Sequence, residues 1–466
     1  MLAFLLVLVV VLAVLVGVHW YVWRRLVRDV TVPGGLPRRL GTVAVVALPL
    51  LSVAALTSSR AGAPFWFQQV VAWPGFLWLA LLLYVTLALV VGEAVRPVLR
   101  RALARRAAQA APAPAAPAVT APEPAPAPAP EPVSVPEKAS ASAPASDVKE
   151  PTAPADATAS TDTPAAPSAP SAPSAPSAPS APETPAAPPA EVSRRLFVSR
   201  VVGGSAAAVA LGTVGYGTYG VLRGPRVKRV TVPLAKVPRA AHGYRIAVVS
   251  DIHLGPILGR AHSRRIVDTI NSTQPDLIAI VGDLVDGTVE NLGSAAEPLA
   301  ELRARHGSFF VTGNHEYFSG ADAWVDHVRE LGLRPLRNER VEIAAGFDLA
   351  GVDDVAGENE GQGPDFVRAL GDRDRARAAV LLAHQPIVIH DAVRHGVDLQ
   401  LSGHTHGGQL WPGNYLAELA NPTVAGLERY GDTQLYVSRG AGAWGPPVRV
   451  GAPSDITIVE LASKQA

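Results

Sequence analysis

The chain contains no cysteine and only one methionine among its 466 residues. The missing thiols exclude disulfides and every catalytic or metal site that depends on a thiolate. Charged residues are also scarce, at 17% of the sequence, and 41 basic against 40 acidic side chains leave a formal net charge of +1. Such a balance supplies no general attraction to nucleic acid. The mean hydropathy of +0.20 is high for a soluble protein and points to the long apolar runs.

Three apolar runs lie near the start of the chain, at residues 2–23, 41–57 and 73–92. The first is long enough to cross about 30 Å of hydrocarbon. A cleaved signal peptide is the alternative for it, but no basic residue precedes the run and no small-residue cleavage site follows it. We therefore predict that residues 1–106 form a membrane bundle of three transmembrane helices.

The arginines of this region predict its orientation. They cluster after the first run and after the third, whereas the segment between the second and third runs contains only Arg60. The positive-inside rule therefore places the two arginine-rich flanks in the cytoplasm and the amino terminus outside.

Residues 107–192 are mostly Ala, Pro, Ser and Glu, and we predict a disordered, semi-rigid tether there. Residues 193–222 follow as "SRRLF" and a glycine-rich apolar run. Arg194 and Arg195, with Phe197 two residues on, resemble a twin-arginine signal, which would make the twin-arginine translocase a partner during export. The alternative is that this pair merely flanks an ordinary fourth span. Both interpretations predict a retained anchor and place the residues after 222 outside the cytoplasm.

Residues 226–466 have the pattern of an α/β domain. Short apolar runs that end in polar residues begin at Arg245, Leu277, Phe309, Val380, Leu399 and Leu435. Runs of this length predict strands buried on both faces. Amphipathic stretches at Ser263–Asn271 and Asp322–Leu331 predict helices between them. Because ligands bind at the carboxyl ends of strands in open α/β sheets, the polar residues there are the candidate site.

Metal-binding residue types follow five of these runs directly. They are Asp251 and His253, then Asp283, then Asn314 with His315 and Glu316, then His384, and finally His404 with His406. Imidazole and carboxylate together suit Mn, Fe or Zn. A single hydrolytic metal commonly takes three protein ligands, so this larger set favours two ions with Asp283 between them.

The motifs D-x-H, G-D-x-x-D, G-N-H-E, an isolated H and G-H-x-H, in this order, resemble those of the calcineurin-like metallophosphoesterase superfamily. "GHTHGGQLWPG" and the late segment "SRGAGAWGPPVRVGAPSDITIVEL" are similar to its bacterial membrane-associated branch. The resemblance extends over about residues 228–461. It implies an α/β sandwich of two central β-sheets flanked by helices. The family often has glycine before the isolated histidine, where this chain has Ala383.

The same resemblance implies a ligand set, with one ion bound by Asp251, His253, Asp283 and His406 and a second by Asp283, Asn314, His384 and His404. It also implies that His315 is catalytic, protonating the leaving oxygen or stabilising its charge. Asp286 and Glu316 are candidates to orient His315, with a solvated or capping role as the alternative. Arg439 and Arg449 are candidates to hold a substrate phosphate.

The expected function is that of a membrane-anchored, extracytoplasmic, dinuclear phosphohydrolase. It would hydrolyse a phosphodiester or pyrophosphate, with lipid-linked and envelope-linked phosphates as candidates, by attack of a hydroxide held between two ions. A phosphomonoesterase or nuclease of the same superfamily remains an alternative, as does a non-catalytic binding or transport role of the membrane bundle. The catalytic domain has no basic, aromatic-rich stretch, so we expect no nucleic-acid partner. The scarcity of charged groups within the spans weighs against transport.

Overall fold

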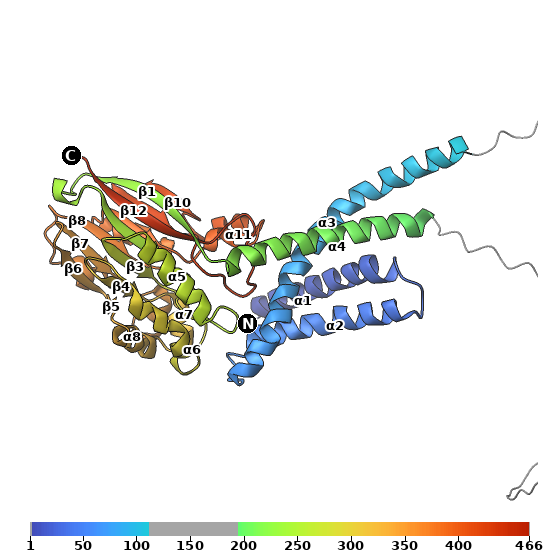
Figure 1. Cartoon of the computed structure of the whole chain (residues 1–466), viewed down its shortest axis with the longest axis horizontal. Helices are drawn as coiled ribbons and strands as arrows, with labels where there is room; N and C mark the ends of the chain where they lie inside the picture. Colours follow the sequence, from blue (N-terminus) through green and yellow to red (C-terminus); the bar gives the residue numbers. More distant parts are fainter. Residues whose placement is uncertain (1, 111–193, 466) are drawn as a thin grey trace, which may run out of the picture. The chain divides into compact units, whose positions relative to one another are not determined.

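The computed structural model describes residues 2–110 and 194–465 (Figure 1). Apart from residues 107–110, these segments form one compact unit. The predicted tether at 107–192 lies outside the described residues, except for its first few positions, which are helical.

Four of the described helices are long and apolar enough to cross a membrane by length and composition. They are α1 (Leu2–Trp23), α2 (Leu36–Thr57), α3 (Phe65–Ala110) and α4 (Arg194–Leu222). A short π-helix, η1 (Arg24–Arg28), follows α1. α3 continues well beyond its predicted apolar run because the Arg- and Ala-rich segment behind that run has a high helix propensity.

Two six-stranded mixed sheets follow α4. The first has the order β1 (Arg226–Leu234), β12 (Asp455–Ser463), β2 (Tyr244–Val249), β3 (Leu277–Val281), β4 (Ser308–Val311) and β5 (Arg334–Pro335). The second has the order β10 (Gly426–Tyr430), β11 (Thr433–Val437), β9 (Leu399–Ser402), β8 (Ala378–Leu382), β7 (Phe347–Gly351) and β6 (Glu339–Ile343). The predicted sandwich of two central sheets is confirmed.

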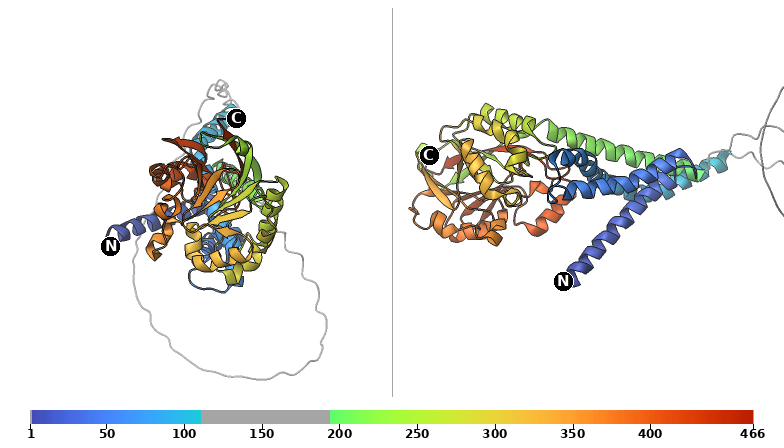
Figure 2. Two further views of the ribbon diagram at one scale, coloured as in Figure 1. Left: turned by 90° about the vertical axis from the view of Figure 1, so that its left-hand side faces the viewer. Right: turned by 90° about the horizontal axis from the view of Figure 1, so that it is seen from below.

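Helices cover the outer faces of both sheets (Figure 2, left). α5 (Arg260–Ser272), α6 (Val289–Ala296) and α8 (Ala321–Glu330) pack on the first sheet, and α9 (Phe366–Leu370) and α10 (Ile389–Arg394) pack on the second. Two further helices, α7 (Asn314–Ser319) and α11 (Gly413–Ala420), follow β4 and β9. Short 3-10 helices lie at Arg239–Ala241, Glu297–Glu301, Val355–Glu360, Pro386–Val388 and His406–Gly408.

The core between the two sheets explains the continuous apolar runs. Successive side chains of a strand point to opposite faces. In β3, Ala279 and Val281 therefore face the second sheet, while Ile278 and Ile280 face the covering helices. Because both faces are buried, every position of the strand is apolar.

Phe347→Ala should destabilise the sandwich, because Phe347 is fully buried between the sheets with its ring edge-on to Tyr244 at 5.1 Å. We expect a loss of about 3–5 kcal/mol, which lowers the unfolding midpoint of the detergent-solubilised chain by roughly 2–4 °C per kcal/mol. Val367→Ala on the exposed face of α9 is the control and should leave the midpoint nearly unchanged. Equal midpoints for the two variants would contradict this assignment of the core.

Candidate metal centre

The predicted ligand residues all follow carboxyl ends of strands, and the strands come from both sheets. Asp251 and His253 follow β2, and Asp283 follows β3. From the second sheet, His384 follows β8, and His404 and His406 follow β9. The sandwich brings these two edges together, so residues far apart in sequence become neighbours.

The first cluster combines Asp251, His253 and His406, whose ligand atoms lie within 4.8 Å of one another. His406 Nε2 lies 3.4 Å from Asp251 Oδ1 and 3.0 Å from His253 Nε2. All three side chains are buried. Burial and the charge of Arg449 hold the pKa of His406 well below its usual range, so its ring stays neutral, as a metal ligand requires.

The second cluster combines Asp283, His384 and His404 within the same limit of 4.8 Å. Asn314 joins it, because its Oδ1 lies 3.0 Å from His404 Nδ1. Burial and the nearby charge of His384 lower the pKa of His404 to about 4. This cluster therefore offers two imidazoles, one carboxylate and one amide oxygen.

Asp283 faces both clusters. Its Oδ2 lies 3.7 Å from His253 Nε2 and 3.2 Å from His384 Nε2. Its Oδ1 accepts a hydrogen bond from the backbone N–H of His315 at 2.9 Å. A carboxylate in this position is placed to be shared by two cations.

The donor atoms fit a pair of divalent ions. His384 Nδ1 lies 2.9 Å from the carbonyl oxygen of Val281, which can accept only from an N–H. His384 Nε2 is then the ring atom that faces the Asp283 carboxylate, at 3.2 Å, and it would offer its lone pair to a cation that displaces its proton. Burial disfavours a charged ring, yet the carboxylates of Asp283 and Asp251 raise the pKa of His384 well above its usual value. The centre thus attracts positive charge. Its ligand atoms are nitrogen and oxygen, with no thiolate, and such a set suits borderline-to-hard ions.

The backbone around the clusters is strained, because five candidate ligands have left-handed φ angles between 49° and 72°. Such angles are uncommon outside glycine and concentrate at functional sites. These residues are Asp251, His253, Asp283, His404 and His406.

Glycines of the motifs permit the close approach of the ligand loops. A Cβ at Gly313 would collide with the Asp283 carboxylate, and one at Gly403 would collide with the Asp251 carboxylate. Only glycine therefore fits at the first position of G-N-H-E and of G-H-x-H, because any side chain there would overlap a ligand carboxylate.

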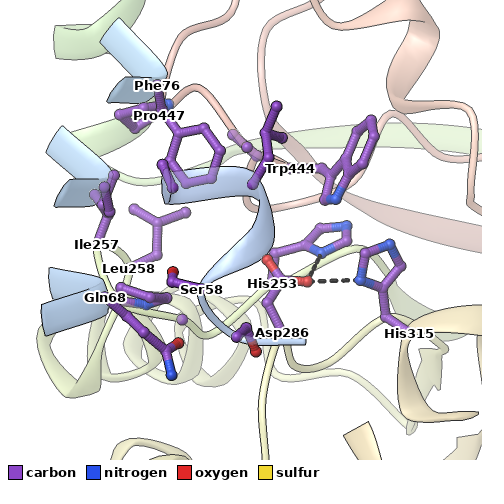
Figure 3. Close-up of a pocket in the computed structure, with 18 of the residues that line it drawn as sticks. Ser58, Gln68, Phe76, His253, Ile257, Leu258, Asp286, His315, Trp444 and Pro447 are labelled. Carbon is purple, nitrogen blue, oxygen red and sulfur yellow. Dashed lines mark hydrogen bonds and ion pairs between the residues drawn. The ribbon is translucent and has the colours of Figure 1, made fainter. Parts of the chain in front are cut away.

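Asp286 joins His253 to His315. Its Oδ1 lies 2.8 Å from His253 Nδ1 and 2.7 Å from His315 Nδ1, as Figure 3 shows. Burial opposes ionisation of Asp286, but the two imidazoles lower its pKa to about 2, whereas Asp286 in turn raises the pKa of the buried His253 to about 9. Of the two candidates to orient His315, Asp286 is the one that contacts it.

Glu316 has the capping role instead. Its buried carboxylate accepts hydrogen bonds from the backbone N–H groups of Asp283, Leu284 and Gly313 at 3.0, 2.7 and 2.6 Å. It therefore ties the loop after β3 to the loop after β4.

The phosphate-binding role expected of Arg449 and Arg439 stays a prediction, and the structure places the two side chains as follows. Arg449 is buried, donates to the carbonyl oxygens of Gly442 (2.7 Å) and His406 (3.1 Å), and lies 2.9 Å from His406 Nδ1. Arg449 thus holds the His406 ring at Nδ1, and Nε2 of that ring faces Asp251 and His253. Arg439 lies beside Gly407, and neither arginine lines the two cavities over the clusters.

These cavities have volumes of about 500 and 970 Å³. Figure 3 shows the smaller one, with His253 and His315 turned towards Asp286 and with Phe76, Ile257 and Leu258 gathered away from that pair. Both cavities are lined by Arg60, His315, Phe318 and Trp444. In the sequence, the only signal for Trp444 is its position within the segment "SRGAGAWGPPVRVGAPSDITIVEL". No sequence signal identifies Arg60 as a neighbour of the centre.

The sequence pattern of the calcineurin-like phosphoesterase family matches residues 244–408. A transmembrane protein with metallophosphoesterase domain from Danio rerio is 39% identical over 264 residues, which are 54% of this chain and 60% of that protein. The chain thus spans less than two thirds of that relative.

Two bacterial relatives are covered more fully. An uncharacterized metallophosphoesterase of Helicobacter pylori is 38% identical over 54% of this chain and 69% of its own length. One of Aquifex aeolicus is 37% identical over 51% of this chain and 92% of its own length. The chain belongs to the calcineurin-like phosphoesterase family, whose members normally bind two divalent metal ions.

Proposed function

We propose that this chain is a membrane-anchored phosphohydrolase with two metal ions that cleaves a phosphodiester or a pyrophosphate outside the cytoplasm. The observation that carries the proposal is the single buried carboxylate of Asp283, which faces imidazoles from both ligand clusters. Lipid-linked and envelope-linked phosphates are the candidate substrates, since four apolar helices precede the domain.

Each ligand has a proposed assignment. Asp251, His253, Asp283 and His406 would hold one ion, and Asp283, Asn314, His384 and His404 would hold the other. Mn, Fe or Zn in these positions would activate water and neutralise charge on the phosphate oxygens.

His315 is the proposed catalytic acid. Its Nδ1 contacts Asp286, so its other ring nitrogen is free to deliver a proton to the leaving oxygen. His315 also lines both cavities, which supports this role because a substrate would occupy one of them. Asp286 fixes this ring by holding His315 and the ligand His253 at once.

The proposed orientation rests on the arginine distribution of the apolar helices. Arginines are frequent after α1 and at the end of α3, while the turn between α2 and α3 has only Arg60. The positive-inside rule then puts that turn, and the domain after α4, outside the cytoplasm. We propose the twin-arginine translocase as the export route and the bacterial membrane-associated branch as the affiliation.

Asp283→Asn should abolish metal-dependent hydrolysis, because an amide cannot supply negative charge to two ions. For the full chain in detergent, stripped and reloaded with manganese, we expect turnover of a bis-aryl phosphodiester to fall at least about 100-fold, or roughly 3 kcal/mol. The fully exposed Asp432→Asn is the control and should retain turnover. Cleavage of an aryl monoester alone by the native chain would overturn the diester preference, and an active Asp283→Asn chain would overturn the shared-carboxylate site.

His315→Ala should leave the metal content unchanged and slow turnover by about 10²- to 10⁴-fold for diesters with a poor leaving group. Diesters of 4-nitrophenol should be affected much less, since that group leaves without protonation. Asp286→Asn should also slow diesters with a poor leaving group more than diesters of 4-nitrophenol, but by a smaller factor. A uniform loss for all leaving groups would argue against a proton-donating role.

Replacing Arg194 and Arg195 by lysine should block export of a folded reporter fused behind the domain, because the twin-arginine pathway reads the guanidinium pair. The matched control replaces Arg100 and Arg101 by lysine and should export normally. Export by the Arg194→Lys, Arg195→Lys chain would refute the route while leaving the orientation intact.

A further inference from the structure

The membrane helices form part of the wall around the candidate metal centre. The larger cavity is lined by Asp283, Asn314 and His404 and also by Leu83 of α3. The smaller cavity joins His253 and Asp286 to residues of α2 and α3. Two segments that lie outside the family match therefore border the space in which a substrate would be cleaved.

Among the residues that the structure describes, Arg60 in the turn between α2 and α3 is the only lysine or arginine that lines either cavity. Its guanidinium carbon lies 5.6 Å from the ring centroid of Phe318, beside His315. Within the described parts of the chain it makes no ion pair with a carboxylate. It is thus a free, fork-shaped donor at the junction of the two cavities, and such a group matches phosphate oxygens.

Part of the wall of the larger cavity is apolar. Leu83, Leu410, Tyr415 and Leu416 line it, the last two from α11. No residue of α11 is buried, and Leu416 is 71% exposed. An exposed apolar surface beside a catalytic centre marks a binding site for an apolar group.

This apolar wall is continuous with the membrane-spanning helices. Tyr84, which follows Leu83 within the apolar run of α3, donates a hydrogen bond to the carbonyl oxygen of Trp411 at 2.9 Å. Leu410 and Val450 pack into the apolar cluster that α1, α3 and α4 form. The wall between α3 and α11 therefore adjoins a helix that is long and apolar enough to cross a membrane, and a hydrocarbon chain suits such a wall.

We propose that the α2–α3 hairpin completes the substrate site: Arg60 binds anionic oxygens of the substrate, and the wall between α3 and α11 receives its hydrocarbon chain. The substrate class is then a phosphodiester or pyrophosphate that carries a long alkyl or acyl chain and is drawn from the bilayer. This inference rests on the proposed function, because it takes the metal centre as the place of cleavage.

A series of 4-nitrophenyl alkyl phosphodiesters with methyl, butyl and octyl chains, kept below their micelle concentrations, tests the apolar wall on the full manganese-loaded chain. We expect kcat/KM to rise with chain length by up to about fourfold for each buried methylene. Leu416→Ser should flatten this dependence, because it removes apolar surface from the proposed wall. Leu419→Ser, on the same helix, 85% exposed and outside the cavity lining, is the matched control and should keep the dependence.

Binding without turnover gives an independent readout. Octylphosphonate should raise the unfolding midpoint of the native chain and of the Leu419→Ser chain more than methylphosphonate does, and this difference should vanish in Leu416→Ser. Equal effects of the two phosphonates on the native chain would overturn the proposed chain site.

Arg60→Gln should lower kcat/KM about 10- to 100-fold for all chain lengths, because one charge-assisted contact is lost. Arg60→Lys should recover part of this loss, and the exposed Arg239→Gln is the control. This inference would be overturned if turnover by the native chain did not depend on chain length, or if the Arg60→Gln chain kept the native kcat/KM. Either result would leave the proposed phosphohydrolase function unaffected. No turnover of any diester by the native chain, with no difference from Asp283→Asn, would overturn both.

Discussion

The buried carboxylate of Asp283 is the contact on which the whole centre depends. It faces His253, which follows a strand of the first sheet, and His384, which follows a strand of the second. A carboxylate buried alone would be costly, but the two imidazoles and the backbone N–H of His315 offset that cost. Because its partners belong to different sheets, the site exists only when both sheets are packed against each other.

The strained backbone follows from the same requirement. Ligand side chains from two sheet edges must converge on a small volume, so the chain turns sharply after each strand and adopts left-handed φ angles at Asp251, Asp283 and His406. Glu316 stabilises the turn at Asp283 by accepting hydrogen bonds from the backbone N–H groups of Asp283, Leu284 and Gly313. Strain of this kind persists only where the surrounding structure holds it in place, and here the rigid sandwich provides that support.

The apolar helices and the domain share a packed contact as well as a covalent connection. Val448, just before β12, belongs to the apolar cluster of α1, α3 and α4. A Cβ at Gly217 of α4 would approach the backbone oxygen of Arg449 to 2.8 Å, so glycine lets that helix come close. Arg449 in turn holds His406. A series of contacts thus connects α4, which is long and apolar enough to cross a membrane, to a candidate metal ligand.

Residue chemistry and local periodicity determined much of this protein without reference to its folded form. The absence of thiols, the apolar runs, the strands buried on both faces and the ordered Asp, Asn and His residues are all local properties, and they predicted an α/β domain and the types of ligand. The sandwich of two sheets was implied by the resemblance of the ordered motifs to a known family. Long-range packing decided the rest. It brought Asp286 to His315 while Glu316 capped the backbone, turned Arg449 towards His406 and away from the cavities, and placed Arg60 beside the centre. No local pattern specifies these contacts, because each joins segments that meet only after the sheets and helices have packed.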